Sequence, residues 1–362
     1  MKFRHICFVN SLRDLGGAEL WFLDAASGLR DRGLEVSIVA QPGSRLLDRA
    51  RQAGLATAAI PIRCDGAPWT LAALWWYFRR TRVTALVCNL TKDLKAAGLA
   101  GRWAGVPVRL ASRESDFPLK SKSYYRWYFR QAATGVLVNS EATRATVLDS
   151  APWLPSQRVH LLYKGIDLKR FQATTPGAAA RPPVVGFVGQ LIERKGLDAL
   201  MAAWSLIDDA DWSDRPRLRL AGEGPLRPVI EQWQTSLNVP GAVSLEGFVE
   251  DIAGFWAGCR CAVLPSRAEG FGLAAAEASA CGLPVVATRI SSLPEVVLDH
   301  ETGLLVPPDD PTALFAALDQ VLRDDRLASK LAAGARGHVA GSFDRDHCLD
   351  RLIQLTCPED PS

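Results

Sequence analysis

The chain has no uninterrupted apolar run of about 18 residues, the length at which a helix can cross a bilayer. The closest stretch, Phe271 to Ala287, is broken by Glu277 and Pro284. Residues 1–10 hold too short an apolar stretch for a signal peptide. These absences predict a protein that is soluble or lies on a membrane surface.

None of the eight cysteines belongs to a Cys-x-x-Cys pair, and several lie in apolar runs. This usage is typical of reduced, buried thiols in a cytosolic protein. The string Asp209-Ala210-Asp211 resembles a metal-binding Asp-x-Asp, but it lies in a loop before Pro216 among further aspartates, and not at a strand end. We interpret it as a solvated acidic loop and expect no metal.

Lys and Arg total 42 and Asp and Glu total 39, so the net charge is only +3 over 362 residues. That balance hides an asymmetry, because residues 1–172 carry 26 basic and 13 acidic side chains, whereas the remainder carries 16 and 26. An apolar fraction of 48% excludes a disordered or fibrous chain. The length and the opposite charges of the two halves predict two domains with different partners.

Short apolar strands alternate with helical stretches along the whole chain. In the first half the expected strands are Ile6–Val9, Glu35–Ala40, Ala85–Cys88, Val108–Ala111 and Gly135–Val138. The proline-containing stretch Gln172 to Pro183 is typical of an interdomain linker. After it the expected strands are Val184–Val188, Arg217–Ala221, Val243–Leu245, Cys261–Leu264 and Pro284–Ala287.

This alternation predicts an α/β fold of two doubly wound domains with mainly parallel sheets. We expect the first domain over residues 1–172 and the second over 183–341, followed by a C-terminal helix and tail over 342–362. Ligands of such sheets bind at the carboxyl ends of the strands, so each domain should present its site to a central cleft.

The segment from Pro265 to Ala278 is the most informative one. A helix expected to begin near Phe271 would direct unpaired backbone N–H groups at a diphosphate. Glu269 precedes this helix and can reach past the phosphates to a sugar. Glu277 lies two turns along, where its carboxylate can accept hydrogen bonds from two ribose hydroxyls. The alternative is a buried, alanine-rich packing helix, which leaves the two carboxylates unexplained.

Three more clusters follow predicted strands. In Gly189 to Gly196, Lys195 and Arg194 would neutralise the departing phosphate, although loop lysines are often merely solvated. Glu223 lies in the glycine-rich Ala221 to Pro225, for which a tight turn is the alternative. Phe248, in Gly247 to Ile252, would frame a base pocket, unless that string is only a capped helix entry.

Taken together, these segments resemble the retaining glycosyltransferases of family 4, also described as glycosyl transferases group 1, which have the GT-B fold. The matching strings appear in the family's order over nearly the whole chain: Gly16-Gly17-Ala18-Glu19, Gly165-Ile166-Asp167 with Phe171, Arg194-Lys195-Gly196, Gly222-Glu223-Gly224-Pro225, Gly247 with Asp251, Glu269-Gly270-Phe271-Gly272 with Glu277, and Gly303-Leu304-Leu305-Val306.

The resemblance implies transfer of a sugar from a nucleotide-sugar, a UDP- or GDP-sugar, with the anomeric configuration retained and without a metal or other cofactor. The acceptor hydroxyl would attack on the face from which the phosphate leaves. The resemblance also implies that the C-terminal helix packs back on the first domain. Together with the clusters described above, the resemblance gives Glu269 and Lys195 as the expected catalytic residues. The expected donor-binding residues are Gly16, Gly17, Gln190, Arg194, Lys195, Glu223, Phe248, Glu269, Gly270, Phe271, Gly272, Leu273 and Glu277.

The chain departs from the family pattern at three places. Gln190 stands where the family often has Arg, and Lys164 stands where Asn commonly precedes Gly165. No histidine follows the strand ending at Ala111, where many members have one near the acceptor. Arg113, Glu114 and Asp116 occupy that place, and we expect them to bind the acceptor; the alternative is a surface loop held by its own ion pairs.

The first half also places basic residues beside aromatic ones, after Leu71 to Phe78 and around Tyr124 to Arg130. Such a pattern suits an anionic bilayer surface or an anionic lipid-linked acceptor, or else a core-facing amphipathic helix. No nucleic-acid motif is present, so nucleic acid is not an expected partner. We expect a cytoplasmic protein, soluble or peripheral on the cytoplasmic face of the inner membrane.

The expected partners are therefore a nucleotide-sugar donor and a glycan or lipid-linked acceptor, in the synthesis of bacterial surface polysaccharide or lipopolysaccharide. Two other functions stay open. One is a different GT-B enzyme, such as a nucleotide-sugar epimerase. The other is a non-catalytic nucleotide-sugar-binding subunit of a glycan-assembly complex, because Gln190 and the missing histidine could mark lost activity.

Overall fold

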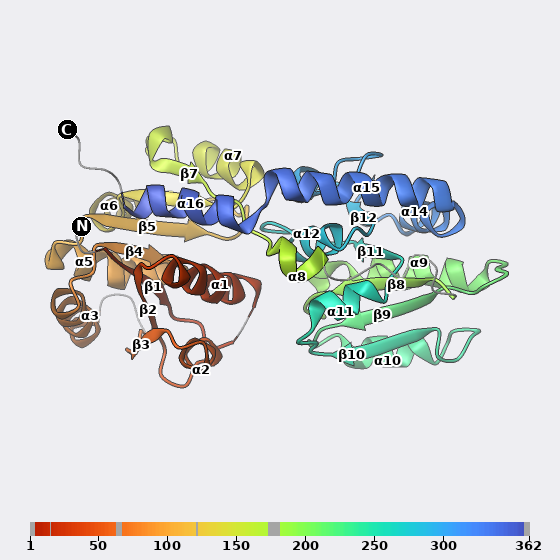
Figure 1. The fold of residues 1–362 in the computed structure, drawn as a ribbon, viewed down its shortest axis with the longest axis horizontal. Coiled ribbons are helices and arrows are strands. Elements are labelled where there is room, and N and C mark those ends of the chain that lie inside the picture. The colour runs from red at the N-terminus through yellow and green to blue at the C-terminus, as the bar shows by residue number, and fades with distance from the viewer. Residues whose placement is uncertain (1–3, 15, 63–66, 121, 173–181, 358–362) are drawn as a thin grey trace. The chain divides into compact units, whose positions relative to one another are not determined.

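The computed structural model describes residues 4–14, 16–62, 67–120, 122–172 and 182–357. The chain forms two units (Figure 1). Unit 1 comprises Met1–Lys164 and Asp346–Ser362, and unit 2 comprises Gly165–Arg345. The chain thus passes to unit 2 after Lys164, earlier than the linker expected from Gln172, and it returns to unit 1 at its C-terminal end. Residues 173–181 of that expected linker lie outside the described residues.

Unit 1 is built on a seven-stranded sheet in the order β3-β2-β1-β4-β5-β6-β7, with every described pair parallel. Its strands are β1 His5–Asn10, β2 Glu35–Ala40, β3 Ala56–Ala59, β4 Ala85–Cys88, β5 Val108–Arg113, β6 Gly135–Val138 and β7 Val159–Leu161. Its helices are α1 Gly17–Asp31, α2 Arg45–Gln52, α3 Pro68–Arg80, α4 Thr91–Asp93, α5 Leu99–Ala104, α6 Ser123–Ala132, α7 Glu141–Ser150 and α16 Arg345–Thr356. A π-helical turn, Leu94–Gly98, joins α4 to α5, and a 3₁₀ turn, Ser156–Arg158, precedes β7.

Unit 2 is built on a six-stranded parallel sheet in the order β10-β9-β8-β11-β12-β13. Its strands are β8 Val184–Val188, β9 Arg217–Ala221, β10 Val243–Gly247, β11 Cys261–Leu264, β12 Val285–Thr288 and β13 Gly303–Val306. Its helices are α8 Leu168–Gln172, α9 Leu197–Asp209, α10 Arg227–Gln234, α11 Ile252–Ala257, α12 Leu273–Ala280, α13 Leu293–Val296, α14 Pro311–Arg323 and α15 Asp325–Ser342, with a 3₁₀ turn at Glu193–Lys195.

Both sheets are covered on two faces. Successive side chains of a strand point to opposite faces, and every residue of β1 and β4 in unit 1 and of β11 and β12 in unit 2 is buried. In β1, Ile6 and Phe8 join one apolar cluster while Cys7 and Val9 join another. In unit 2, Val185 and Phe187 of β8 join one cluster with residues of α9 and α14. The prediction of an α/β fold with two doubly wound parallel sheets is confirmed.

Three strands were not expected from the sequence. β3 consists of Ala-Thr-Ala-Ala and β7 of only three residues, so neither has the branched, apolar alternation that indicates a strand. β13 was noted as a family string, Gly303 to Val306, and not as a strand. All three lie at an edge of their sheet.

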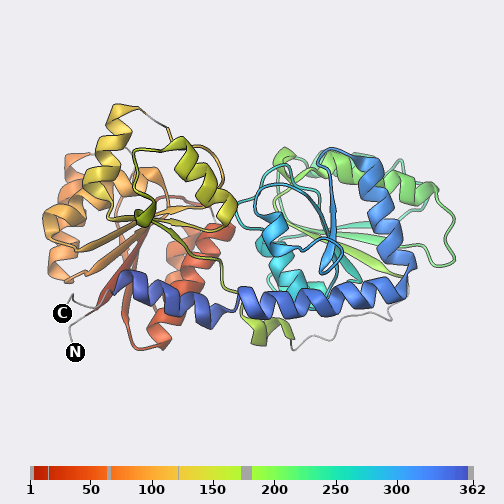
Figure 2. The ribbon, with the colours of Figure 1, turned by 90° about the horizontal axis from the view of Figure 1, so that it is seen from above.

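The C-terminal helix α16 packs on unit 1. Leu349, Leu352 and Cys357 are buried in the cluster that also contains Phe8 and Leu29. Arg32 of unit 1 pairs with Asp346 at 2.7 Å. Figure 2 shows α16, in blue, alongside the red and orange elements of unit 1.

Because Leu352 is fully buried in this cluster, Leu352→Ala should lower the free energy of unfolding by about 2–5 kcal/mol. Urea denaturation followed by circular dichroism measures this change. The neighbouring exposed Arg351→Ala is the control and should change stability by no more than about 0.5 kcal/mol. Equal, small effects of both variants would contradict the packing of α16 on unit 1.

Candidate active site

The loops that follow β8, β9 and β10 are joined by backbone hydrogen bonds at the carboxyl end of the unit 2 sheet. Gly189 donates to the carbonyl of Ala221 at 3.0 Å, and Gly222 donates to that of Gly247 at 2.7 Å. A Cβ at Gly222 would lie 1.8 Å from the Gly189 carbonyl oxygen, and its φ is +148°. Glycine is therefore required for these loops to approach one another.

The loop after β8 also contacts the loop after β11. The Arg194 guanidinium donates to the carbonyl of Ala268 at 2.7 Å, and the Arg267 amide donates to the carbonyl of Arg194 at 2.8 Å. A Cβ at Gly196, whose φ is +66°, would lie 1.9 Å from the Pro265 carbonyl oxygen. The two segments that the sequence singles out for phosphate and sugar binding thus lie side by side.

Lys195 and Glu269 form an ion pair across these two loops. Lys195 Nζ lies 2.5 Å from Glu269 Oε1, and the side chains are 13% and 8% exposed. The Ser266 hydroxyl donates to the same carboxylate oxygen at 2.8 Å. A carboxylate at this depth is favourable only because the ammonium and the hydroxyl replace its hydration. The two residues expected to be catalytic are therefore in direct contact.

Helix α12 begins at Leu273, two residues later than expected, with Gly272 as its N-cap at φ +90°. The first N–H groups of a helix have no acceptor within the helix, so this end offers donors to an anion. The Phe271 ring is only 3% exposed and packs on Phe343 at 5.2 Å between centroids. If Phe271 contacts the expected nucleotide-sugar, it would therefore do so through its backbone and not through its ring.

Glu277 lies in the second turn of α12 and is half-buried. Burial raises the pKa of its carboxyl from 4.5 to about 7, and the positive charge of Arg170 in α8 opposes that rise. Arg170 lies between two parts of a motif of the resembled family, Gly165 to Asp167 and Phe171. The sequence alone gives Arg170 no role. Its charge near Glu277 becomes visible only when α8 and α12 are seen to lie together.

Other side chains expected to bind the donor are on the surface of unit 2. Gln190 is exposed, and Phe248 is 56% exposed. Glu223 is also exposed and lies 3.8 Å from Arg227. Gly270 and Leu273 flank the start of α12 and are partly exposed. These positions share the carboxyl end of the sheet with Lys195 and Glu269.

The glycines expected at the donor phosphates from the first domain lie at the start of α1 in unit 1. The Gly16 amide donates to Glu19 Oε2 at 3.0 Å, while Asn10 and Asn89 both donate to Glu19 Oε1, at 2.8 and 3.0 Å. Glu19 is buried, so it is the residue that orders the Gly16 and Gly17 turn after β1.

The residues expected at the acceptor lie at the end of β5 and in the loop that follows it. Glu114 pairs with Lys164 at 2.5 Å and also accepts a hydrogen bond from Ser112. The Arg113 guanidinium donates to the carbonyl of Phe117 at 2.7 Å, and Asp116 is half-buried in the same loop. The loop is thus held in part by its own contacts and by Lys164.

Lys164 is the residue of this region that the sequence did not assign a role. It is 3% exposed, and its Nζ lies 3.7 Å from the centroid of the Trp21 ring in α1. Burial lowers the pKa of its ammonium, and Glu114 opposes that effect. Lys164 therefore joins the start of α1 to the loop after β5.

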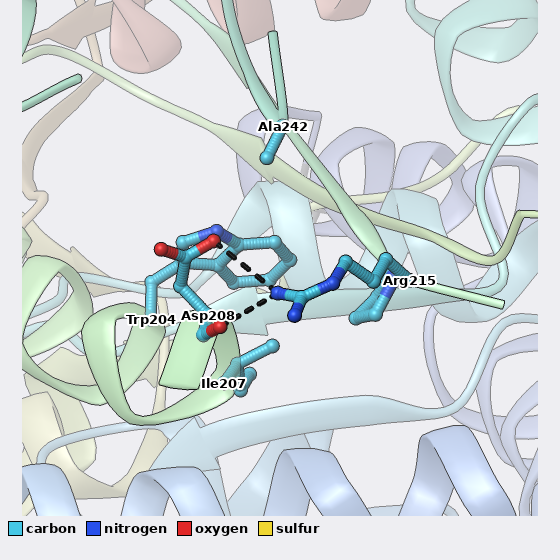
Figure 3. A pocket seen from close by; sticks show the side chains of 6 residues that line it. Trp204, Ile207, Asp208, Arg215 and Ala242 are labelled. Carbon is cyan, nitrogen blue, oxygen red and sulfur yellow. Dashed lines mark hydrogen bonds and ion pairs between the residues drawn. The ribbon is translucent and has the colours of Figure 1, made fainter. Parts of the chain in front are cut away.

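A small pocket at the opposite end of the unit 2 sheet is structural (Figure 3). Arg215, just before β9, points at the end of α9, where its guanidinium donates to the Asp208 carbonyl at 2.6 Å and lies 3.8 Å from the carboxylate. The same carboxylate accepts from the amide of Asn238 at 2.5 Å. This pocket is next to the acidic string Asp209 to Asp211 and far along the sheet from Lys195.

Within the described ranges, no group of three His, Cys, Asp or Glu side chains could hold a metal ion. In the same part of the chain, no helix is both long and apolar enough to span a bilayer.

Comparisons with known proteins show the family and the fold of the chain. The model of Glycosyltransferase Family 4 matches residues 15–170, and that of glycosyl transferases group 1 matches residues 182–324. The D-inositol 3-phosphate glycosyltransferase of Thermomonospora curvata is 34% identical over 94% of this chain and 90% of its own. The lipopolysaccharide core biosynthesis glycosyltransferase LpsE of Rhizobium meliloti is 26% identical over 98% of each chain.

Solved structures share the whole fold. Anabaena Alr3699/HepE in complex with UDP-glucose has a TM-score of 0.83 at 21% identity, covering 97% of this chain and 98% of its own. The apo form of the lipopolysaccharide outer core galactosyltransferase WaaB has a TM-score of 0.73 at 14% identity, with the same coverage. At these identities the likeness establishes the fold, which is GT-B.

The raised pKa of Glu277 predicts how stability depends on pH. A carboxyl whose folded pKa lies above its unfolded value stabilises the protein below the unfolded pKa, and this stability is lost as the pH rises to about 7. Glu277→Gln removes the titration. Its Tm relative to wild type should therefore rise by about 2 °C or more between pH 5 and pH 8.

Scanning calorimetry without ligand at the two pH values measures this difference. The exposed Glu301→Gln is the matched control, with a difference expected to stay constant. A constant difference for Glu277→Gln as well would show that this carboxyl titrates at its ordinary pH.

Proposed function

The chain belongs to the glycosyltransferases of GT-B fold, and from this premise we propose that it transfers a sugar from a UDP- or GDP-sugar to a glycan or lipid-linked acceptor with retention of the anomeric configuration. The observation that carries the proposal is the Lys195–Glu269 pair beside the N-terminus of α12. In this pair the Lys195 ammonium can bind a diphosphate and the Glu269 carboxylate can bind a sugar. Both lie at the carboxyl end of the sheet, where such folds bind nucleotides.

In the proposed reaction the acceptor hydroxyl attacks the anomeric carbon on the face from which the diphosphate departs. The bond from that carbon to the phosphate oxygen breaks, and the leaving phosphate takes the acceptor's proton. Negative charge grows on the diphosphate, so Lys195 and the first N–H groups of α12 stabilise the transition state. No metal is needed in this scheme.

Lys195 can serve the donor without releasing Glu269. An ammonium has three N–H donors, so Nζ can keep its contact with Glu269 Oε1 and still donate to a phosphate oxygen. Ser266 holds the same carboxylate. Glu269 would then accept hydrogen bonds from the sugar hydroxyls with its other oxygen, while ionised Glu277 would accept those of the ribose.

The acceptor is proposed from the relatives and from unit 1. Lipopolysaccharide core synthesis is named for LpsE, which matches nearly the whole chain. Arg113, Glu114 and Asp116 are the proposed acceptor residues, and Lys164 positions their loop through Glu114. The buried, free thiols of Cys7, Cys88, Cys259 and Cys261 support a reducing, cytoplasmic compartment.

The donor is testable with a panel of UDP-, GDP- and ADP-sugars incubated with the protein but without acceptor. We expect one donor to raise the Tm and to be hydrolysed slowly, with release of its nucleoside diphosphate, including in EDTA. Binding without any turnover, with or without glycan acceptors, would instead support a non-catalytic subunit. Conversion of a nucleotide-sugar to its epimer would support the other enzyme class.

Lys195→Ala and Glu269→Gln should each lower turnover at least about a hundredfold, because each removes charge stabilisation from a water-poor site. Since the two side chains touch, the double variant should be much less impaired than the product of the single effects. Steady-state kinetics with the donor that the nucleotide-sugar panel identifies measures the turnover of the two single variants and the double variant.

Exposed Lys330→Ala in α15 is the matched control and should keep wild-type turnover. Circular dichroism of each variant separates lost chemistry from lost fold. Near-normal turnover of both single variants would contradict the assignment of Lys195 and Glu269 as catalytic residues, even if the chain proved to be a glycosyltransferase.

A further inference from the structure

Helix α3 of unit 1 is apolar on the side that faces away from the core. Its inner residues Leu74 and Phe78 are buried, whereas Trp69, Trp75 and Trp76 are 72%, 41% and 56% exposed. The helix has no charged residue before its last two, Arg79 and Arg80. A surface helix of a soluble protein is normally polar on its outer face, so this one needs another explanation.

The neighbouring helices also expose aromatic side chains. α5 packs between α3 and α6, and the three lie together at one side of unit 1 (Figure 1). Trp103 of α5 and Trp127 of α6 are 59% and 52% exposed, and Tyr124 of α6 is 47% exposed. Every exposed tryptophan of the described residues lies on these three helices. We call Trp69, Trp75, Trp76, Trp103, Tyr124 and Trp127 the aromatic face.

The charged residues of the three helices that carry the aromatic face have one sign. The three helices contain no Asp or Glu. Five arginines on them are exposed, namely Arg79, Arg80, Arg102, Arg126 and Arg130. The Arg80 guanidinium lies over the Trp76 ring at 5.3 Å. A surface of amphipathic aromatic rings among arginines is complementary to the interface of a bilayer that carries anionic headgroups.

We propose that the aromatic face docks unit 1 on an anionic membrane surface. The tryptophan rings would enter the headgroup layer, and the arginines would contact lipid phosphates. A second copy of this chain is a poorer occupant, because a twofold contact would bring the same positive surface against itself. No helix of the described residues could span the bilayer, so attachment is peripheral.

This inference goes beyond the proposed function, because the aromatic face contains none of the residues proposed for donor or acceptor. α6 follows the loop of Arg113 to Asp116 in the chain. Docking through α3, α5 and α6 would therefore hold unit 1, with its proposed acceptor loop, at the surface where a lipid-linked acceptor resides.

Flotation of the full chain with lipid vesicles tests the proposal. Vesicles of phosphatidylcholine are compared with vesicles in which a third of the lipid is phosphatidylglycerol. We expect binding at least tenfold tighter to the anionic vesicles, weakened by 0.5 M salt. Brominated lipid should quench tryptophan fluorescence, since only rings that enter the bilayer meet the bromine.

Two variants locate the surface. Trp69→Ser, Trp75→Ser and Trp76→Ser combined should abolish binding and quenching. Arg79→Gln with Arg80→Gln should weaken binding about thirtyfold, as expected for two cations at an anionic surface. Arg326→Gln with Lys330→Gln removes the same charge from exposed positions of α15 in unit 2 and is the matched control, with wild-type binding expected.

Donor hydrolysis should be unchanged in all these variants, so failure of the membrane proposal is distinguishable from failure of the proposed function. No binding to anionic vesicles would overturn the proposal, as would equal loss in the α15 control. Light scattering that shows a dimer lost in the tryptophan variant, without vesicle binding, would assign the face to a second copy instead.

Discussion

The ion pair between Lys195 and Glu269 is the interaction on which the candidate active site of unit 2 depends. A carboxylate that is 8% exposed would be strongly destabilising alone, and the ammonium 74 residues away in the chain makes its burial tolerable. The pair can form only because the loop after β8 touches the loop after β11. That approach in turn requires a residue without a Cβ at Gly196. Backbone geometry thus comes first, and the charges follow from it.

Unit 1 uses a similar device at the corresponding end of its own sheet. Lys164, after β7, is buried against Trp21 and paired with Glu114 of the loop after β5. In both units a lysine after one strand holds a glutamate after another. The sheets' carboxyl ends therefore carry buried charges in polar loops, while a pair at the other end of the unit 2 sheet, Arg215 with Asp208, lies in a small structural pocket.

Strand alternation made the fold readable from the sequence, and six expected strands have the observed bounds, among them Glu35–Ala40 and Val184–Val188. Edge strands such as β3 were missed because they need little apolar alternation when only one neighbour pairs with them. The strings around Lys195 and Glu269 were also readable, since glycines next to strand ends mark close approaches.

Contacts between distant positions could not be read in this way. Arg170 and Lys164 look like ordinary basic residues in the chain, and only packing places one near Glu277 and the other beneath Glu114. The direction of the Phe271 ring could not be predicted either, because a glycine on each side allows the ring to point inward or outward. It points inward because it packs on Phe343, 72 positions later in the chain. A pattern of residue types predicts which chemistry is present, whereas the partner of each side chain depends on the fold.

The aromatic face shows the converse case, in which the sequence left two interpretations open and the fold shows which side chains each one can account for. Aromatic and basic residues around Tyr124 to Arg130 fitted a core-facing helix as well as a membrane surface. In the structure α6 contributes Phe129 and Ala132 to the core, whereas Trp127 lies on its exposed side. Folding gains nothing from the part of a tryptophan ring that stays in water. Their gathering on α3, α5 and α6, among arginines and without acids, is therefore better explained by what unit 1 contacts than by how it folds.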